Sequence, residues 1–500
     1  MPEGRPDSGD GAPLPAPAAA IAAHHASGGP AVGLGSLLWE GTAYPGVQVG
    51  IPLSVLNRHG LVAGGDDDGR TEVVRLLAER LSAQGVPVLL ADIEGALSGV
   101  SAPGAGGDRV RRRAAAAGQH WTATGFPADF HALGGLGGGI PVRTTATGFG
   151  PLLMARALGL DHGQERSLDL VYRYADAKGA EMYDLEDLRA VTAFLGTGEG
   201  RADAGPGGLP PDAAGELLRT LTVFDARGAS AFFGEPGFDT ADLLRTAEDG
   251  RGVVSVIGSA AVRDRPRLFS AFLLWLLADL CQGLPEAGDP GRPVLVVLLG
   301  GTRPLFDGAG GAFLESVTRM VRHVRTKGVG VFFAAGTPKD VPEELLGLLG
   351  NRVVRRADAE ATATVTVAGA DGTATTPAET LLRAPESSAG PLDPADLDSA
   401  VRGSALYLRY SRADDRKSAF EKLVDVRSAA EAVSRPPSAG RGASPAGSAS
   451  APPLPAAGDE GLVERVAGTG VFTALAGAAG RPGSTVGPAV TRSLLGVRGR

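Results

Sequence analysis

The segment best suited to chemistry is a glycine-rich turn, GGDDDGRT at residues 64–71. It fits the P-loop pattern G-x-x-x-x-G-[K]-[ST], except that arginine replaces the lysine. A P-loop needs glycines whose backbone N–H groups surround phosphate oxygens, a lysine for the β- and γ-phosphates, and Ser or Thr for Mg²⁺. The candidate cofactor-binding residues are therefore Gly64, Gly69, Arg70 and Thr71, with ATP and Mg²⁺ as cofactors if the site survives.

Two departures weaken this P-loop. Arg70 carries a planar fork where a compact ammonium normally sits, and three successive aspartates, residues 66–68, occupy the arch. Two like charges about 4 Å apart repel by roughly 1 kcal/mol in water and about 4 kcal/mol at an effective dielectric near 20. An aspartate facing the phosphates would therefore weaken nucleotide binding, whereas one pointing to solvent would cost far less.

The elements around this turn indicate an α/β fold, with a mainly parallel sheet covered by helices on both faces. A run of helical patterns between the two halves of the sheet predicts a helical insertion. The expected strands are residues 60–63, 87–93, 252–257, 293–299, 328–334 and 352–354; the expected helices are 71–84, 267–281, 313–326 and 342–349, with 151–160, 165–177 and 185–197 in the insertion.

Composition divides the chain further, because two stretches rich in Ala, Pro, Gly or Ser lack apolar periodicity. The expected parts are a disordered N-terminal arm (1–30), the first part of the core with the P-loop (31–150), the helical insertion (151–230), the second part of the core (231–370), an extension of the core (371–433), a linker (434–460) and a loosely ordered tail (461–500).

Charge and cysteine usage limit the possible partners. A single cysteine, Cys281, excludes an internal disulfide, and no run approaches 18 apolar residues, so we expect a cytoplasmic protein without a membrane span. The net charge of −8 does not support general DNA binding. Two local clusters could still bind DNA or could simply be solvated faces: Arg109 with Arg111–Arg113, and Arg319, Arg322, Arg325 and Lys327.

Other reactive side chains are expected to be structural. His59 should pack or form a hydrogen bond at the start of a strand, and Cys281 should be a small buried hydrophobe rather than a nucleophile. No histidine pairs with acids at metal-ligand spacing, so no metal site is predicted from side chains.

Segments in a fixed order carry a resemblance to a known family. They are LNRHGLVAG (56–64), ADI (91–93), LSG (97–99), GPLL (150–153), YRYAD (172–176), FGEP (233–236), LLWLL (273–277), KGVGV (327–331), DVP (340–342), LGNRV (349–353) and DRKSAFEKL (415–423). Together they resemble the HerA-like bacterial ATPases, in particular the YjgR-type branch, over roughly residues 35–430. The resemblance implies a RecA-like P-loop NTPase fold, ATP with Mg²⁺ and, through the related HerA and FtsK motors, a ring that translocates DNA.

The residues that hydrolyse ATP in this family are largely replaced. The family's Asp-Glu pair, for Mg²⁺ and the attacking water, corresponds to Gly300 and Gly301, and its γ-phosphate-sensing glutamine corresponds to Gly336. Near the family's Asp-x-Lys-Gly-Asp, only Asp92 and Gly95 are retained. No catalytic residue is therefore assigned. The next acids downstream, Asp307 and Glu315, are displaced too far along the chain to substitute.

Three interpretations remain open. The chain could be a pseudo-ATPase that acts as a scaffold or regulatory subunit, as a homo-oligomer or in a mixed ring with an active relative. It could instead be a weak ATPase or DNA translocase in which a neighbouring subunit supplies Arg322 or Arg325. Sequence alone does not separate the first interpretation from a decayed gene product without activity. Loss of the lysine and both carboxylates favours the pseudo-ATPase, because phosphoryl transfer depends on positioning and charge neutralisation.

Overall fold

A computed structural model describes residues 14–26, 28–258, 265–287, 291–300, 305–306, 311–369, 372–413 and 418. The described chain divides into two compact units. The first runs to Val142 and resumes over Phe238–Arg412; the second contains Arg143–Gly237 together with residues 413 and 418.

The first unit contains a twelve-stranded sheet in the order β2-β1-β12-β11-β10-β3-β9-β8-β4-β7-β5-β6. From β10 to β6 all neighbours are parallel, and from β2 to β10 all are antiparallel. The strands are β1 (Ala31–Trp39), β2 (Thr42–Pro52), β3 (Gly60–Gly64), β4 (Val88–Asp92), β5 (Ala128–Leu133), β6 (Ile140–Val142), β7 (Val254–Gly258), β8 (Leu295–Leu299), β9 (Val329–Ala335), β10 (Asn351–Arg355), β11 (Thr362–Thr366) and β12 (Ala378–Leu382).

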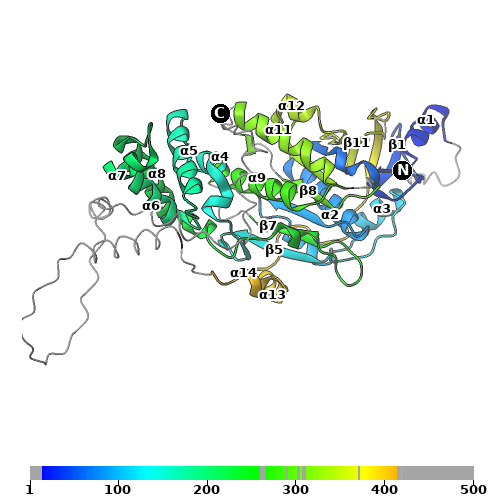
Figure 1. Cartoon of the computed structure of the whole chain (residues 1–500). Coiled ribbons are helices and arrows are strands. Elements are labelled where there is room, and N and C mark those ends of the chain that lie inside the picture. The colour runs from blue at the N-terminus through cyan, green and yellow to red at the C-terminus, as the bar shows by residue number, and fades with distance from the viewer. Residues whose placement is uncertain are drawn as a thin grey trace, which may run out of the picture. The chain divides into compact units, whose positions relative to one another are not determined.

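The central strands are apolar throughout because both faces of the sheet are covered. β4, β8 and β9 are buried at every position, which is typical of parallel strands between two helical layers. Helix α2 packs against β3, β4, β8 and β9, while α11 packs against β9 and α9 (Figure 1). The helices of this unit are α1 (Ala16–His25), α2 (Asp67–Ala83), α3 (Asp108–Ala116), α9 (Pro266–Gly283), α11 (Gly311–Thr326), α12 (Glu343–Leu346), α13 (Pro394–Gly403) and α14 (Tyr407–Tyr410), with 3₁₀ turns η1 (Leu53–Arg58), η2 (Ser98–Ser101), η4 (Thr240–Leu244) and η6 (Pro338–Asp340).

The parallel half confirms the fold class expected from the sequence. All six predicted strands are present, and the glycine-rich turn links β3 to α2 as a P-loop requires. Strand β9 separates β3 from β8, the strand that precedes the family's Asp-Glu positions. The chain therefore has a RecA-like P-loop fold.

The antiparallel half was not predicted, because glycine and proline interrupt the alternation in its strands. In β1, glycine is needed at Gly35, since a Cβ there would lie 2.0 Å from the carbonyl oxygen of Leu381 in β12. Pro45 and Pro52 lie in β2, which is the edge strand, where proline is tolerated. Strands β5 and β6 of the parallel half were also missed.

Part of the expected disordered arm is ordered. Ala16–His25 forms α1, because its alanine-rich sequence has high helix propensity and its last two residues bind the hairpin that precedes β12. Expecting disorder across 1–30 was therefore wrong for α1, while residues 1–13 lie outside the described residues.

The second unit is helical, and the predicted insertion lies within it. It contains α4 (Ala146–Leu158), α5 (His162–Ala177), α6 (Leu185–Gly196), α7 (Gly198–Ala204), α8 (Pro211–Ala226) and η3 (Ala229–Phe232), drawn from cyan to green in Figure 1. Capping boxes at Asp161 and Asp184 start α5 and α6 close to the predicted positions. Sequence reasoning did not predict α8.

The expected linker (434–460) and tail (461–500) lie outside the described residues, as does most of the expected extension beyond residue 413. Among the helices in the described part of the chain, none combines the length and apolar character needed to cross a bilayer.

Candidate functional site

The P-loop turn begins with two glycines in the left-handed region of backbone space. Gly64 has φ 76° and Gly65 has φ 67°, which only glycine adopts without strain. A Cβ at Gly64 would also lie 2.5 Å from the carbonyl oxygen of Arg355. The retained glycines therefore fit the turn for steric reasons that do not require a nucleotide.

Helix α2 starts earlier than its apolar pattern predicted. It begins at Asp67 rather than residue 71, because Asp66 is its N-cap and the Asp66 Oδ1 atom accepts a hydrogen bond of 2.8 Å from the Gly69 N–H. In a nucleotide-binding P-loop, phosphate oxygens use backbone N–H groups of this turn. Here a carboxylate of the protein engages the Gly69 N–H.

Arg70 does not extend toward a ligand in this conformation. Its Nη1 donates to the Gly65 carbonyl oxygen at 2.9 Å and more weakly to the Gly64 carbonyl oxygen at 3.4 Å, and its Nη2 binds the Asp67 carboxylate. The guanidinium is thus engaged by the loop itself. Thr71 is half-buried in the first turns of α2.

A second arginine, missed from the sequence, lies against the same loop. Arg355 ends β10, pairs in register with Gly64, and donates from Nη1 to the Thr362 carbonyl oxygen at 3.3 Å. A Cβ added to Gly69 would lie 3.0 Å from both Nε and Nη2 of Arg355 and 2.8 Å from Asp66 Oδ1. Only the pairing of β10 with β3 brings Arg355 here, so no local motif could have indicated it.

Removing the cap tests this description of the loop. Asp66→Ala should lower the free energy of unfolding by about 1 kcal/mol, because the Gly69 N–H loses its acceptor. Urea unfolding of the full chain measures the change. Asp68 is an exposed residue of the first turn, so Asp68→Ala is the matched control. It should change the free energy of unfolding by only a few tenths of the change expected for Asp66→Ala. Equal losses in the two variants would contradict the assigned cap.

Strand β8, after which the family resemblance predicts the catalytic carboxylates, is followed by glycine. Gly300 follows β8 and donates its N–H to the Ala91 carbonyl oxygen at 3.2 Å. A Cβ at Gly300 would lie 2.8 Å from that oxygen, so an aspartate could not enter without a backbone shift. Gly301 and Asp307 lie outside the described residues. Glu315 pairs with Arg319 at 2.9 Å on an exposed face of α11, which fits a solvated ion pair.

This crowding predicts that the Mg²⁺ aspartate cannot simply be restored. Gly300→Asp should lower the free energy of unfolding by about 2 kcal/mol through overpacking against β4. It should not produce ATP hydrolysis. Thermal and urea unfolding, together with phosphate release, provide the readouts. Gly46→Asp is a control, because a Cβ there meets nothing within 4 Å. A fully stable Gly300→Asp variant would disprove the crowding.

The retained Asp92 and Gly95 organise a turn. Asp92 Oδ1 accepts from the Gly95 and Ala96 N–H groups at 2.8 and 3.1 Å, and Oδ2 accepts from Leu97 N–H at 2.8 Å. Burial raises the pKa of Asp92, and these N–H groups oppose the shift. Gly95 has φ 75°, which favours glycine. Both residues are thus explained by the fold without a nucleotide.

The sensor position is also part of the scaffold. The Gly336 carbonyl oxygen accepts from the Gly64 N–H at 3.2 Å, which joins the end of β9 to the start of the P-loop turn. A Cβ at Gly336 would lie 3.1 Å from Asp340 Oδ2. Gly336 therefore lies beside the loop and carries no side chain.

Most of the arginine cluster on α3 is neutralised within the chain. Arg113 pairs with Glu72 at 2.5 Å and also donates to the carbonyl oxygens of Leu382 and Arg383. Arg109 pairs with Glu360, and Arg111 pairs with Asp108. Arg113 is therefore structural, whereas Arg109 and Arg111 form exposed ion pairs.

The cluster on α11 is only partly neutralised. Arg319 pairs with Glu315, and Lys327 pairs with Glu286 at 3.1 Å. Arg322 and Arg325 are exposed.

The two side chains expected to be structural are buried. His59 Nδ1 accepts from the Val331 N–H at 3.2 Å, so the expected hydrogen bond at the strand start is present. Cys281 is buried, and burial raises the pKa of its thiol to about 12, which makes it a poor nucleophile.

ATP with Mg²⁺ does not fit these residues. The loop's own side chains already bind the Gly69 N–H and the Arg70 guanidinium, and the position of the Mg²⁺ aspartate is Gly300. Among the described residues, no group of three His, Cys, Asp or Glu side chains could hold a metal ion.

Comparison with known proteins identifies the family. The model described as "Helicase HerA-like C-terminal" matches residues 40–359 and 357–500, most of the chain. The chain therefore belongs to the HerA-like helicase family, as the sequence segments predicted. A search of curated proteins gave no match.

Solved structures show a distant similarity. The plasmid coupling protein TrwB in complex with the non-hydrolysable GTP analogue GDPNP is 13% identical, with a TM-score of 0.46, over 71% of this chain and 91% of that chain. VirB4 of Thermoanaerobacter pseudethanolicus is 11% identical, with a TM-score of 0.46, over 75% of this chain and 99% of that chain. At these TM-scores the similarity adds nothing to the family assignment.

Proposed function

We propose that this member of the HerA-like family is a pseudo-ATPase that acts in the cytoplasm as a scaffold or regulatory subunit. The proposal rests on a self-bonded P-loop, one whose hydrogen-bonding groups are satisfied by the loop's own residues. The Asp66 carboxylate accepts a hydrogen bond from the Gly69 N–H, and the Arg70 guanidinium donates to loop carbonyl oxygens. A nucleotide would have to displace both contacts before it could bind.

Charge strengthens the argument. Three aspartates at residues 66–68 begin α2, where the helix dipole favours negative charge. Their carboxylates replace a bound phosphate as the negative charge at the start of the helix. They would also repel the phosphates of a nucleotide. Two arginines, Arg70 and Arg355, lie beside them and offset part of this charge without a ligand.

Loss of the catalytic carboxylate supports the same proposal. Phosphoryl transfer needs Mg²⁺ positioned and water oriented. Gly300 lies so close to the Ala91 carbonyl oxygen that a side chain there would be crowded. This packing is consistent with a site that no longer carries an acidic residue after β8. A scaffold keeps the fold for binding, either as a homo-oligomer or in a mixed ring with an active relative.

A residual ATPase or DNA translocase is the alternative, favoured by the retained Thr71 and by the exposed Arg322 and Arg325 on α11. In that case a neighbouring subunit would contribute an arginine to the nucleotide, and DNA binding would weaken steeply with salt.

Phosphate release by the purified full chain separates the two functions. The pseudo-ATPase should show no Mg²⁺-dependent turnover above background, with or without DNA. Turnover that disappears in Thr71→Ala would overturn the proposal and support the alternative. The variant also controls for a contaminating ATPase, whose activity would persist unchanged.

A further inference from the structure

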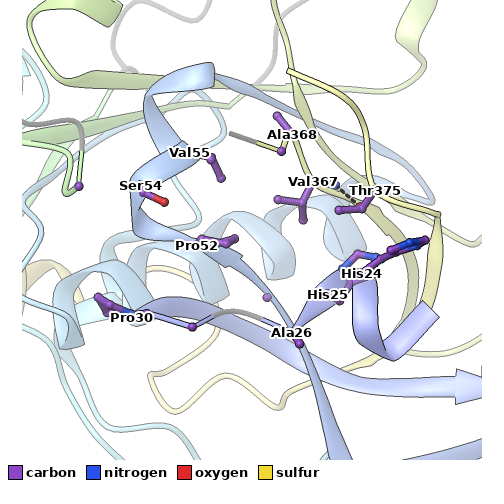
Figure 2. Close-up of a pocket in the computed structure, with 15 residues that line it drawn as sticks. His24, His25, Ala26, Pro30, Pro52, Ser54, Val55, Val367, Ala368 and Thr375 are labelled. Atoms are coloured by element: carbon purple, nitrogen blue, oxygen red, sulfur yellow. Dashed lines mark hydrogen bonds between the residues drawn. The ribbon is translucent and has the colours of Figure 1, made fainter. Parts of the chain in front are cut away.

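A cavity of about 360 Å³ lies in the first unit beside the end of α1 (Figure 2). Its walls come from α1, the segment leading into β1, the end of β2, η1 and the hairpin after β11. The polar side chains among its lining residues are His24, His25, Ser54 and Thr375, and the remaining lining residues are glycine, proline, alanine or valine.

Helix α1 has few anchors. Only Ala18 and His25 are buried among its ten residues. His24 Nδ1 forms a 2.8 Å hydrogen bond with Thr376 Oγ1, and His25 Nε2 forms one of 2.8 Å with the Thr376 carbonyl oxygen. Docking of α1 therefore depends heavily on the two histidines.

The contacts of His25 fix its protonation. A carbonyl oxygen can only accept, so the His25 Nε2 atom carries the proton and Nδ1 has the lone pair in the neutral ring. Nδ1 is buried and has no hydrogen-bond partner among the described residues. Protonation would create a buried N–H⁺ group without an acceptor, which is costly.

Among the described residues that line the cavity, none offers an acidic side chain to compensate that charge. The other titratable group among the described lining residues is His24, on α1 itself, and none of the lining residues from β2, η1 and the hairpin is titratable. Burial lowers the pKa of His25; the Thr376 carbonyl opposes this shift and the neighbouring His24 adds to it.

We propose that His24 and His25 form a pH-operated clasp, which holds α1 beside the cavity at neutral pH and releases it in mildly acidic solution. Because the folded-state pKa of His25 is depressed, the clasp contributes stability above the ordinary histidine pKa and loses it as the pH falls below that value. Release of α1 removes one wall of the cavity and exposes its interior.

Hydrogen exchange of the full chain tests the clasp. Protection factors of the α1 amides, corrected for intrinsic rates, should fall by up to about tenfold between pH 7.5 and 5.5, relative to those of β1. His25→Gln keeps a donor for the Thr376 carbonyl but cannot titrate, so its α1 protection should be the same at both pH values. His162→Gln, at an exposed histidine, should behave as wild type.

Two results would overturn the clasp: unchanged α1 protection in the wild type, or an equal loss in His25→Gln. If His25→Gln leaves α1 unprotected at both pH values, His25→Phe is used instead, because phenylalanine fills the space without titrating. Unchanged α1 protection in the wild type, or an equal loss in His25→Phe, would then overturn the clasp.

Discussion

Replacing Glu79 by alanine is expected to lower the free energy of unfolding by about 4 kcal/mol, the largest effect of any substitution considered for this chain. Glu79 lies in α2 with no exposed surface. Its Oε1 accepts from the Ser387 N–H and hydroxyl at 3.0 and 2.5 Å, and its Oε2 accepts from the Glu386 N–H at 2.8 Å. Removing the carboxylate leaves these buried donors without an acceptor.

The contacts of Glu79 also tie the segment after β12 to the P-loop helix. Glu79→Gln should lower the free energy of unfolding by about 2 kcal/mol. The amide keeps the side-chain volume and one acceptor oxygen, but its NH2 group faces a hydrogen-bond donor where the carboxylate had an acceptor. Urea unfolding of the full chain gives both values. Glu315→Gln, in an exposed ion pair, should change stability by less than about 0.5 kcal/mol. Similar losses at Glu79 and Glu315 would contradict the anchoring role.

The second large effect is a loss of stability in acid that is caused by buried histidines. Burial lowers the pKa of His131 to about 4, and burial together with the Arg325 charge lowers that of His59 to about 4. Both values lie below the ordinary histidine pKa, so the unfolded chain binds more protons and stability falls as the pH drops from about 6.5 toward 4. Each histidine should cost roughly 2 kcal/mol at pH 5 relative to pH 8.

His131→Phe isolates one of these contributions. Neither ring nitrogen of His131 has a partner among the described residues, and the ring contacts Phe238 edge-on with centroids 5.2 Å apart. Phenylalanine should keep that contact and reduce the stability difference between pH 8 and pH 5 by about 2 kcal/mol. Buried acids with raised pKa values, such as Asp92, give the free energy of unfolding the opposite pH dependence. The contribution of His131 is therefore obtained by subtracting the variant's curve of unfolding free energy against pH from that of the wild type. A difference curve that is flat with pH would contradict the burial of a neutral His131.

The sequence predicted six of the eight strands of the parallel half, because most of them are buried and therefore apolar throughout. Runs such as β8 and β9 leave a signal that needs no knowledge of their neighbours. The antiparallel half leaves a weaker signal. In β1, glycines at close strand contacts break the alternation. In the parallel half, β6 was missed because it is only three residues long.

The sequence predicts a loss of catalytic residues through the family resemblance, and this stays a prediction, but the way the loop bonds to itself could not be predicted. Gly300 and Gly336 are visible as replacements because the family motif fixes their places. The cap by Asp66 depended on whether its carboxylate turned inward or to solvent, which the sequence left open. Arg355 reaches the loop only through strand pairing across 290 residues of chain, so nothing near residue 355 indicates it.

Titration of ATP into the full chain, with and without Mg²⁺, tests the self-bonded P-loop most directly. The account predicts no detectable binding heat at millimolar nucleotide under either condition, because Asp66 and Arg70 already satisfy the loop and the Mg²⁺ aspartate is absent. Saturable Mg²⁺-dependent binding that disappears in Thr71→Ala would show that the site survives and would contradict the central claim.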